Sequence, residues 1–208
     1  MVQKKKRLSA AARRAQLIGV GKRVFAERGY EATSVEEIAS RAKVSKPVLY
    51  EHFGGKEGLY AVVVDREIET VVARITEAIG SGTPRHRTEQ ATAAFLHYVK
   101  QEPEGFAILC HDSPVAVSGG GMSSLLSTVA ERVGDVFTKM FKGAGYSPKY
   151  APIYAHALIG MVTFVGQWWT ETQSPSVDKV ASHLSALAWM GLRHLPMKPE
   201  GVSTKPRR

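Results

Sequence analysis

The residues best suited to chemistry in this chain lie in a short polar and aromatic segment, KPVLYEHFGGK, from Lys46 to Lys56. Cationic, phenolic and imidazole side chains at this spacing suit contacts with phosphate oxygens and base edges. A helix from Ser45 to Phe53 would be roughly 13 Å long at 1.5 Å per residue. The DNA major groove is about 12 Å wide and admits such a helix. The segment therefore predicts a helix that enters a DNA groove.

Two short helices joined by a tight turn would position this segment. Ser34 and Glu37 have the spacing of a capping box, in which the hydroxyl accepts from a backbone N–H and the carboxylate reaches back. Apolar residues then recur at i, i+3, i+4 and i+7 over residues 35–42, which predicts a helix with one apolar stripe. Ser45 is the expected cap of the next helix, and Pro47 lies in its first turn, where a missing N–H costs little.

The flanking segments complete a helix-turn-helix head. Residues 9–28 predict a helix that covers the pair, and Gly29 is a favourable stop. Gly54 and Gly55 interrupt the chain after the second short helix, and Lys56 opens a long helix. A cation at a helix N-terminus opposes the helix dipole, but a phosphate bound there would remove the conflict. We therefore expect Lys56 to contact a phosphate.

Basic residues are concentrated at the amino-terminal end. The whole chain carries a net charge of +9. Residues 1–56 hold 13 Lys and Arg against 5 Asp and Glu, which gives +8, whereas residues 57–208 hold 15 against 14, which gives +1. A cationic end on a nearly neutral body is directed at a polyanion. The charge distribution therefore supports nucleic-acid binding independently of the motif.

The run TSVEEIASRAKVSKPVLYEHFGGKEGL, from Thr33 to Leu59, resembles the signature of TetR-family transcriptional regulators, and the preceding segment from Val24 to Ala32 fits it as well. One departure is Gly55, where the family often has Ser, Asn or Asp as a helix cap. The resemblance implies that DNA phosphates are held by Ser34, Tyr50, His52 and Lys56. It implies that bases are read near Lys46, Pro47 and Val48.

Length and composition indicate a globular protein of one or two compact units. The 208 residues are 44% apolar and 23% charged. The longest apolar run, from Ala157 to Gly166, is about half the ~20 residues that span a bilayer, so no membrane segment is expected. The amino terminus lacks the apolar core of a secretory signal, and the single Cys110 excludes an intrachain disulfide. These features favour a cytoplasmic protein.

The pattern of the whole chain predicts an all-α fold of about nine helices. We expect a basic flexible arm over residues 1–8, which could be solvated or contact DNA. A helix-turn-helix DNA-binding domain follows over 9–55, then a helical domain for effector binding and dimerisation over 56–195. A basic disordered tail is expected over 196–208. No cofactor is expected, and His97, His111 and His156 lack the spacing of metal ligands.

Aromatic and methionine residues cluster in the second part of the chain and together fit a site for a small lipophilic effector. For any one of them, burial in the core is the commoner role. The family resemblance implies the same kind of ligand. An acyl chain or acyl thioester is the first candidate, and a sterol- or drug-like molecule is the next. The predicted lining residues are Phe95, Tyr98, Phe106, Phe137, Met140, Phe141, Met161, Phe164, Gln167 and Trp168.

The last two predicted helices, 149–170 and 177–195, carry two broad apolar faces. These faces could be core. However, one helix-turn-helix contacts too little DNA for tight specific binding, and such motifs usually act as symmetric dimers. The resemblance implies a homodimer formed by these helices as a four-helix bundle. The predicted interface residues are Ala155, Leu158, Val162, Leu184, Leu187 and Ala188.

These features predict a ligand-responsive transcription regulator, in most of the family a repressor, that binds a palindromic operator on double-stranded DNA. Effector binding would press the short helix near 104–111 against the long helix 56–79 and so move the two reading heads. One alternative is a peripheral membrane protein whose basic arm lies on anionic lipid. The other is an enzyme acting on a lipophilic substrate, although no nucleophile and base pair is evident. Neither alternative explains residues 46–56 as well.

Overall fold

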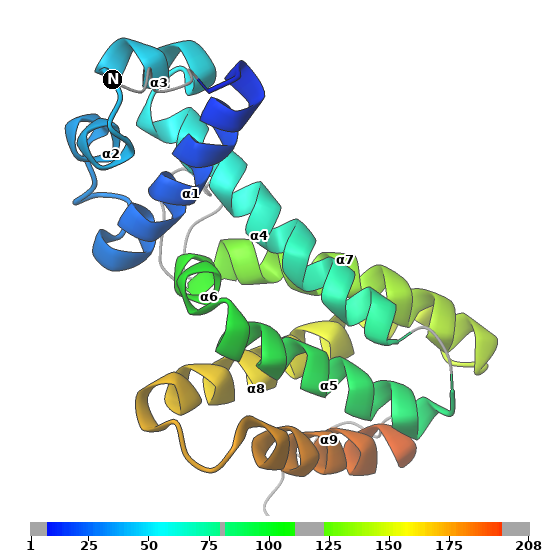
Figure 1. The fold of residues 1–208 in the computed structure, drawn as a ribbon. Helices are drawn as coiled ribbons and strands as arrows, with labels where there is room; N and C mark the ends of the chain where they lie inside the picture. Colours follow the sequence, from blue (N-terminus) through cyan, green and yellow to red (C-terminus); the bar gives the residue numbers. More distant parts are fainter. Residues whose placement is uncertain (1–7, 80–81, 111–122, 197–208) are drawn as a thin grey trace, which may run out of the picture. The chain divides into compact units, whose positions relative to one another are not determined.

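The computed structural model describes residues 8–79, 82–110 and 123–196 (Figure 1). Residues 1–7 of the predicted basic arm, the predicted tail beyond residue 196 and His111 lie outside these residues. Within them the chain is all-α, as predicted, with nine α-helices and one 3-10 turn, Pro148–Tyr150. The α-helices are α1 Ala10–Arg28, α2 Val35–Ala42, α3 Lys46–Phe53, α4 Lys56–Ala78, α5 Pro84–Gln101, α6 Pro103–Cys110, α7 Ser123–Gly143, α8 Ala151–Thr172 and α9 Val177–Arg193.

The helices form two compact units. The first contains the chain up to Ala73 and the segment from Tyr98 to Val129, and the second contains residues 74–97 and the chain from Ala130 onward. The division falls inside α4 and α5, so each of these helices contributes residues to both units. The helix-turn-helix segment lies within the first unit. No described helix has the length and apolar character needed to cross a membrane.

The core of the first unit begins where α1 covers α2 and α3. Leu17, Val24 and Phe25 of α1 are almost completely buried. The predicted stripe of α2 is buried as well, and Leu49 is the buried residue of α3. Helices of eight residues are marginal in water when isolated, so this packing is what keeps α2 and α3 helical.

A buried carboxylate connects α1, α4, α5 and α6 in the first unit, where α6 packs against α1. Glu67 of α4, 9% exposed at its side chain, accepts from Lys22 Nζ at 2.8 Å and from the Tyr98 hydroxyl at 3.1 Å. Lys22 also donates to Glu102 at 2.9 Å. A Cβ on Gly105 would lie 2.0 Å from Glu67 Oε2, so α6 approaches the carboxylate closely.

The charge of Lys22 is maintained by these partners. Burial alone would lower the pKa of Lys22, but hydrogen bonds and charge attraction from Glu67 and Glu102 outweigh burial and raise the pKa above its usual value. Lys22 therefore stays charged at neutral pH. Sequence reasoning missed this cluster, although a Glu beside Ile68 in an apolar stripe was a usable signal.

In the second unit, α8 and α9 contact each other after a turn at Pro175. Trp169 Nε1 of α8 donates to the Pro175 carbonyl at 2.8 Å and so fixes the turn that leads into α9. The inner face of α8 is buried, and so is one face of α9. These two helices, with the end of α4, α5 and α7, form the walls of a cavity.

Gly58 should be required where α3 joins α4, because a Cβ there would lie 2.0 Å from the Phe53 carbonyl oxygen. We expect Gly58→Ala to lower the free energy of unfolding by about 1–3 kcal/mol, as overpacking does. Gly19→Ala is the matched control, since nothing lies within 4 Å of its Cβ position. That change should stabilise α1 by up to about 1 kcal/mol. Urea unfolding followed by circular dichroism measures both, and equal effects would contradict this assignment.

Candidate nucleic-acid interface and ligand cavity

The turn between α2 and α3 is fixed by backbone geometry and by α1. Lys43 ends α2 in the left-handed conformation with φ of 55°, and the Val44 N–H donates to the Ala39 carbonyl at 3.0 Å. Gln16 of α1 donates to the Ala42 carbonyl at 3.0 Å, so a carbonyl at the end of α2 has a partner. The turn that orients α3 is therefore attached to α1.

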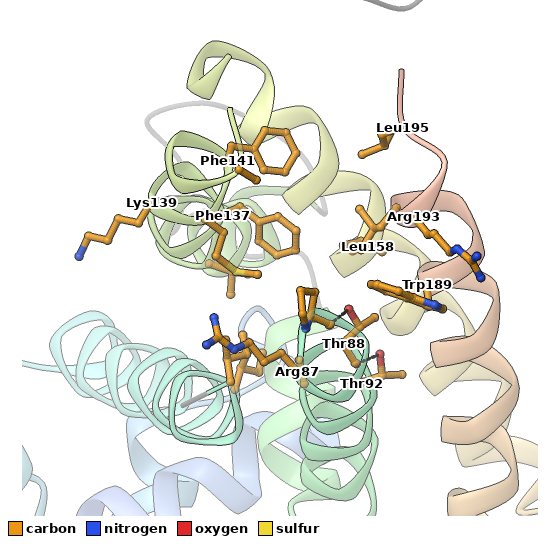
Figure 2. Close-up of a pocket in the computed structure, with 18 of the residues that line it drawn as sticks. Arg87, Thr88, Thr92, Phe137, Lys139, Phe141, Leu158, Trp189, Arg193 and Leu195 are labelled. Atoms are coloured by element: carbon orange, nitrogen blue, oxygen red, sulfur yellow. Dashed lines mark hydrogen bonds between the residues drawn. The ribbon is translucent and has the colours of Figure 1, made fainter. Parts of the chain in front are cut away.

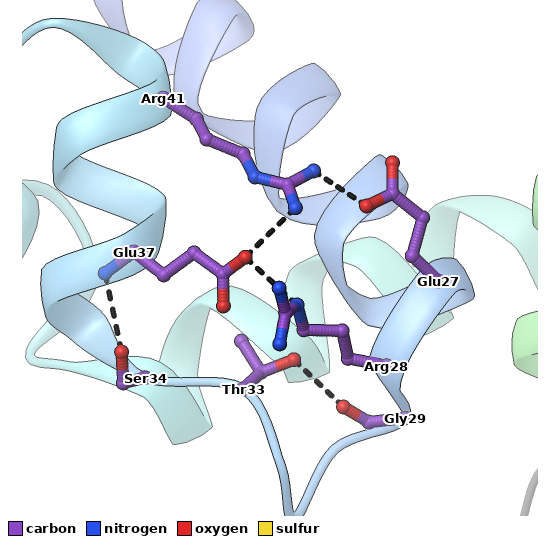
Figure 3. Close-up of polar contacts among 7 residues, drawn as sticks. All are labelled: Glu27, Arg28, Gly29, Thr33, Ser34, Glu37 and Arg41. Carbon is purple, nitrogen blue, oxygen red and sulfur yellow. Dashed lines mark hydrogen bonds and ion pairs between the residues drawn. The ribbon is translucent and has the colours of Figure 1, made fainter.

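The predicted capping box at α2 is half formed (Figure 3). The Ser34 hydroxyl accepts from the Glu37 N–H at 3.1 Å, as expected. The expected return bond from the Glu37 carboxylate was wrong, because that carboxylate instead accepts from Arg28 at 2.9 Å and from Arg41 at 2.8 Å. Two guanidinium groups are stronger partners for a carboxylate than one backbone N–H. Glu37 thus ties α2 to the end of α1.

The outer face of α3 presents most of the predicted DNA contacts. Lys46, Pro47 and Tyr50 are exposed, the last by 53%, whereas Val48 is partly exposed. Ser45 occupies the cap position, but its side chain makes no capping hydrogen bond, contrary to expectation. Pro47 lies in the first turn as predicted.

Lys46 is held by an acid on α2. Its ammonium pairs with the exposed Glu36 carboxylate. The hydrogen bond to Lys46 lowers the pKa of Glu36, and the same bond raises the pKa of Lys46. Both side chains are in water, so the pair can separate when Lys46 meets another acceptor.

The base of α3 is held by α1 through a backbone contact and an aromatic contact. Arg14 donates to the His52 carbonyl at 3.0 Å and lies 4.5 Å from the centre of the Phe53 ring. Gly54 then ends α3 with φ of 72°. His52 is partly exposed and Ser34 is exposed, so both predicted phosphate contacts remain accessible to solvent.

Lys56 opens α4 as predicted, and it has a partner within the chain. Its ammonium donates to the Tyr30 carbonyl at 3.0 Å and lies 4.2 Å from the centre of the Tyr30 ring. Lys56 therefore closes the loop between α1 and α2 when no DNA is bound. Its predicted contact with a phosphate requires the ammonium to share or exchange this carbonyl.

A cavity of about 670 Å³ lies in the second unit (Figure 2). This volume is in the range of small-molecule sites. Figure 2 shows Phe137 and Phe141 of α7 on one side, and Leu158 of α8 with Trp189 of α9 on the other. Arg87, Thr88 and Thr92 line it from α5, and both threonine hydroxyls donate to carbonyls of their own helix.

Some of the predicted pocket residues line this cavity and others do not. Those that line it are Phe95, Phe137, Met140 and Phe141. Tyr98 and Phe106 are buried in the first unit, where Tyr98 bonds Glu67. Met161, Phe164, Gln167 and Trp168 are outside the lining, and Phe164 is 75% exposed. Sequence reasoning missed Arg87, because an arginine on a helix is usually solvated. It also missed Trp189, although an aromatic residue in this part of the chain was a usable signal.

The predicted interface residues of α8 and α9 fall mostly on inner faces. Ala155, Val162, Leu184 and Ala188 are buried within the protomer, and Leu158 lines the cavity; Leu187 is exposed by 62%. The outer faces of the same helices carry large exposed apolar side chains. These side chains are Ile153, Phe164, Trp168, Leu187 and Met190.

No group of His, Cys, Asp and Glu in the part of the chain that the structure describes is arranged to hold a metal ion. The head instead has a reading helix on a short tight turn, and the second unit has an apolar cavity. A three-helix head of this kind defines the class of helix-turn-helix DNA-binding proteins.

Comparison with known proteins identifies the family. Residues 17–63 match the model for bacterial regulatory proteins of the tetR family, and residues 74–203 match the tetracyclin repressor-like C-terminal domain. The chain belongs to the TetR family of transcriptional regulators. It is therefore a DNA-binding transcription regulator and not an enzyme, and family membership implies an operator and an effector.

Individual relatives agree with this assignment. The chain is 30% identical over 194 residues to the HTH-type transcriptional activator FasR of Mycolicibacterium smegmatis, covering 92% of this chain and 88% of that protein. It is 32% identical over 79 residues to the transcriptional repressor KstR2 of Rhodococcus jostii, covering 38% and 39%.

Two solved structures share the fold. A TetR-like regulator from Rhodococcus sp. RHA1 matches with a TM-score of 0.73 at 26% identity, over 91% of this chain and all of that one. The fatty acid degradation regulator FadR from Bacillus halodurans matches with a TM-score of 0.70 at 17% identity, over 91% and 100%. At 17% identity the second likeness concerns the fold alone.

Substitutions at the first residue of α3 and at the first residue of α4 should separate base contacts from phosphate contacts. Lys56→Ala should weaken binding to all duplexes by a similar factor and reduce the slope of log K against log salt by about 0.9. Lys46→Ala should instead change which base pairs are preferred, by about tenfold at one position. Fluorescence anisotropy over a salt series, with operators selected from random oligonucleotides, measures both effects.

The control for this pair is Lys142→Ala, which removes an exposed cation of α7 that lies outside the cavity lining. Because Lys56 also bonds the Tyr30 carbonyl, the melting temperature of each variant should be compared first. A Lys56 variant that is folded but keeps the wild-type salt slope would contradict the phosphate contact.

Proposed function

We propose that this regulator binds a palindromic operator as a homodimer and that a small lipophilic effector alters its DNA affinity. The observation that carries the proposal is the exposed face of α3, with Lys46, Pro47 and Tyr50 held outward by the buried Leu49. Phosphates would be held by Ser34, Tyr50, His52 and Lys56, with bases read near Lys46, Pro47 and Val48. The two α3 helices would enter major grooves about 34–36 Å apart, or a multiple of this. Such a protein acts in the cytoplasm, with the chromosome.

The exposed outer faces of α8 and α9 support the homodimer. Ile153, Phe164 and Trp168 follow one side of α8, and Leu187 and Met190 follow one side of α9. Several large apolar side chains exposed on one side of a helix suit an interface with another chain. The small residues Ala157 and Gly160 lie on the same side of α8, and both are exposed, which favours close helix approach. A second copy of the chain is the partner that the family resemblance implies.

A charge on this face should separate the subunits. We expect Phe164→Glu to give a monomer at micromolar concentration, because burying an unpaired carboxylate in an apolar interface is strongly unfavourable. Asp135→Arg, at an exposed site of α7, changes charge without touching this face and should leave the oligomeric state unchanged. Analytical ultracentrifugation distinguishes the outcomes. A wild-type monomer, or a dimeric Phe164→Glu, would refute the assignment.

The cavity supports a lipophilic effector. Its walls are mostly apolar, and an alkyl chain gains about 0.8 kcal/mol for each methylene buried, or about fourfold in affinity. An acyl chain or acyl thioester is therefore our first candidate. An enzyme with this fold is excluded by the family, and the lipid-surface alternative would leave the exposed face of α3 without a role.

A route from the cavity to the head runs along two helices. Ile75 of α4, Ile79 just after that helix and Phe95 of α5 line the cavity. The same helices carry Glu67 and Tyr98, which hold Lys22 of α1. A ligand that displaces the cavity-lining part of either helix would thus alter the geometry around Lys22. In this mechanism the movement reaches α1 through Glu67, and not through α6 alone.

Effector and operator should then weaken each other's binding by the same factor. Calorimetric titration of dodecanoate and dodecanoyl-coenzyme A, with and without operator, measures this factor, which is typically 5- to 150-fold. Tyr98→Phe removes the hydroxyl that bonds Glu67 and should reduce the factor several-fold while leaving each separate affinity within about twofold. Tyr154→Phe is a control in the second unit. Equal affinities with and without operator would eliminate the mechanism.

The direction of regulation follows from where the operator lies. Repression, expected for most of the family, requires the bound dimer to obstruct transcription, and release by effector would relieve it. The relative with near-complete coverage is an activator, whereas KstR2 is a repressor. An effector can act in either case only if it prefers one of two conformations.

A further inference from the structure

The wall of the cavity in the second unit includes a charged side chain, Arg87, that binding of an apolar chain does not require. Arg87 of α5 lines the cavity, and its Nε is buried. In the part of the chain that the structure describes, this Nε has no hydrogen-bond partner. Buried donors are paired in the great majority of cases, so an unpaired one needs an explanation. A group that a ligand would supply is one explanation.

The charges around the cavity are all of one sign. Arg87, Lys139 and Arg193 are among its lining residues, and no Asp or Glu is among the described residues that line it. This segregation is not a consequence of a basic body, because residues 57–208 hold 15 Lys and Arg against 14 Asp and Glu. A cavity lined by cations and by no carboxylates, in a part of the chain that is nearly neutral, is suited to an anion.

The three cations differ in position. Lys139 is exposed, and Figure 2 shows its side chain pointing away from the cavity. Arg193 is exposed too. Arg87 is only partly exposed and runs along the wall with its Nε out of contact with water. Of the three, Arg87 is therefore the one that offers a bound ligand a nitrogen shielded from solvent.

We propose that the effector is an anionic amphiphile whose negatively charged headgroup binds the guanidinium of Arg87 while its apolar part fills the space between Phe137 and Trp189. This rests on the proposed function, since it assumes that the cavity is the effector site. A guanidinium has five donors in a planar fork and pairs with a carboxylate or phosphate in two parallel hydrogen bonds. The headgroup is either the carboxylate of a free acid or a phosphate of a coenzyme A thioester.

Ligands that share one alkyl chain and differ in headgroup test the proposal. Dodecanoate, dodecanol, dodecyltrimethylammonium and dodecanoyl-coenzyme A are titrated into the full-length protein, with tryptophan fluorescence as the readout, because Trp189 lines the cavity. Wild-type protein should bind at least one of the two anions about tenfold more tightly than the alcohol. The cation should bind more weakly than the alcohol. This comparison needs no variant.

Arg87→Met keeps the length of the side chain and removes its charge. It should abolish the preference for the anion and leave dodecanol affinity within about twofold. The anion whose affinity falls identifies the source of the headgroup. Arg85→Met is the matched control, because Arg85 lies on the same helix, pairs with Glu89 at 2.8 Å and does not line this cavity. That variant should keep the wild-type preference.

The outcomes separate the two proposals. If the alcohol and both anions bind equally well, or if Arg87→Met keeps the preference, the headgroup assignment is overturned and the lipophilic effector stands. If none of the four ligands binds, the lipophilic effector and the headgroup assignment both fall. Circular dichroism of each variant shows whether it is folded, and an unfolded Arg87→Met is replaced by Arg87→Gln in the same comparison.

Discussion

The arrangement of the DNA-binding head depends on the attachment of an eight-residue helix to α1. A helix as short as α3 is marginal in water when isolated, because its nucleation cost is spread over few hydrogen bonds. Here Leu49 is fully buried, Arg14 binds the His52 carbonyl and Gln16 binds the Ala42 carbonyl. These contacts hold α3 by its inner face and its C-terminal end, and they hold the end of α2 that precedes it. The outer face of α3 does not pack against the core and is therefore available for DNA.

The buried charge of Glu67 extends the same constraint toward the rest of the chain. A buried ion pair is often no more stabilising than apolar packing, but losing one partner is strongly destabilising. The contacts of Glu67 therefore restrict the position of Lys22 relative to α4 and α5. Such a pair contributes specificity of arrangement more than net stability. In the proposed homodimer, whose two α3 helices would have to match the groove spacing, a specific arrangement matters.

Much of the head and the helix order could be predicted from sequence, because the signals are local. The cap at Ser34, the stop at Gly54 and the stripe of α2 depend on neighbours within one helix turn. The fate of the Glu37 carboxylate could not be predicted, since Arg28 comes from another helix. The partner of Lys56 was missed because Tyr30 lies 26 residues earlier, in the loop between α1 and α2.

The residues of α8 show more clearly what a sequence pattern cannot predict. This helix is apolar on two opposite sides, so periodicity alone does not say which side faces inward. Ala155 and Val162 proved to be interior, whereas Phe164 and Trp168, predicted to line the pocket, are exposed. Apolar character was detected correctly, but its direction is a property of the tertiary fold. Arg87 was missed because an arginine on a helix is usually solvated, and only burial of its Nε distinguishes it.

The two apolar sides of α8 also restrict how an effector can act. If the outer side is fixed against a second subunit, α8 and α9 are the least able of the cavity walls to move. The volume of a ligand must then be accommodated mainly by the other lining helices, α4, α5 and α7. Of these, α4 carries Glu67 and α5 carries Tyr98, whose hydroxyl bonds it. Proteins move between discrete packings more readily than they deform continuously, so a small displacement there favours a second arrangement of Lys22. With the proposed interface and the proposed effector site, the structural change on effector binding would therefore reach α1, the helix that holds α3.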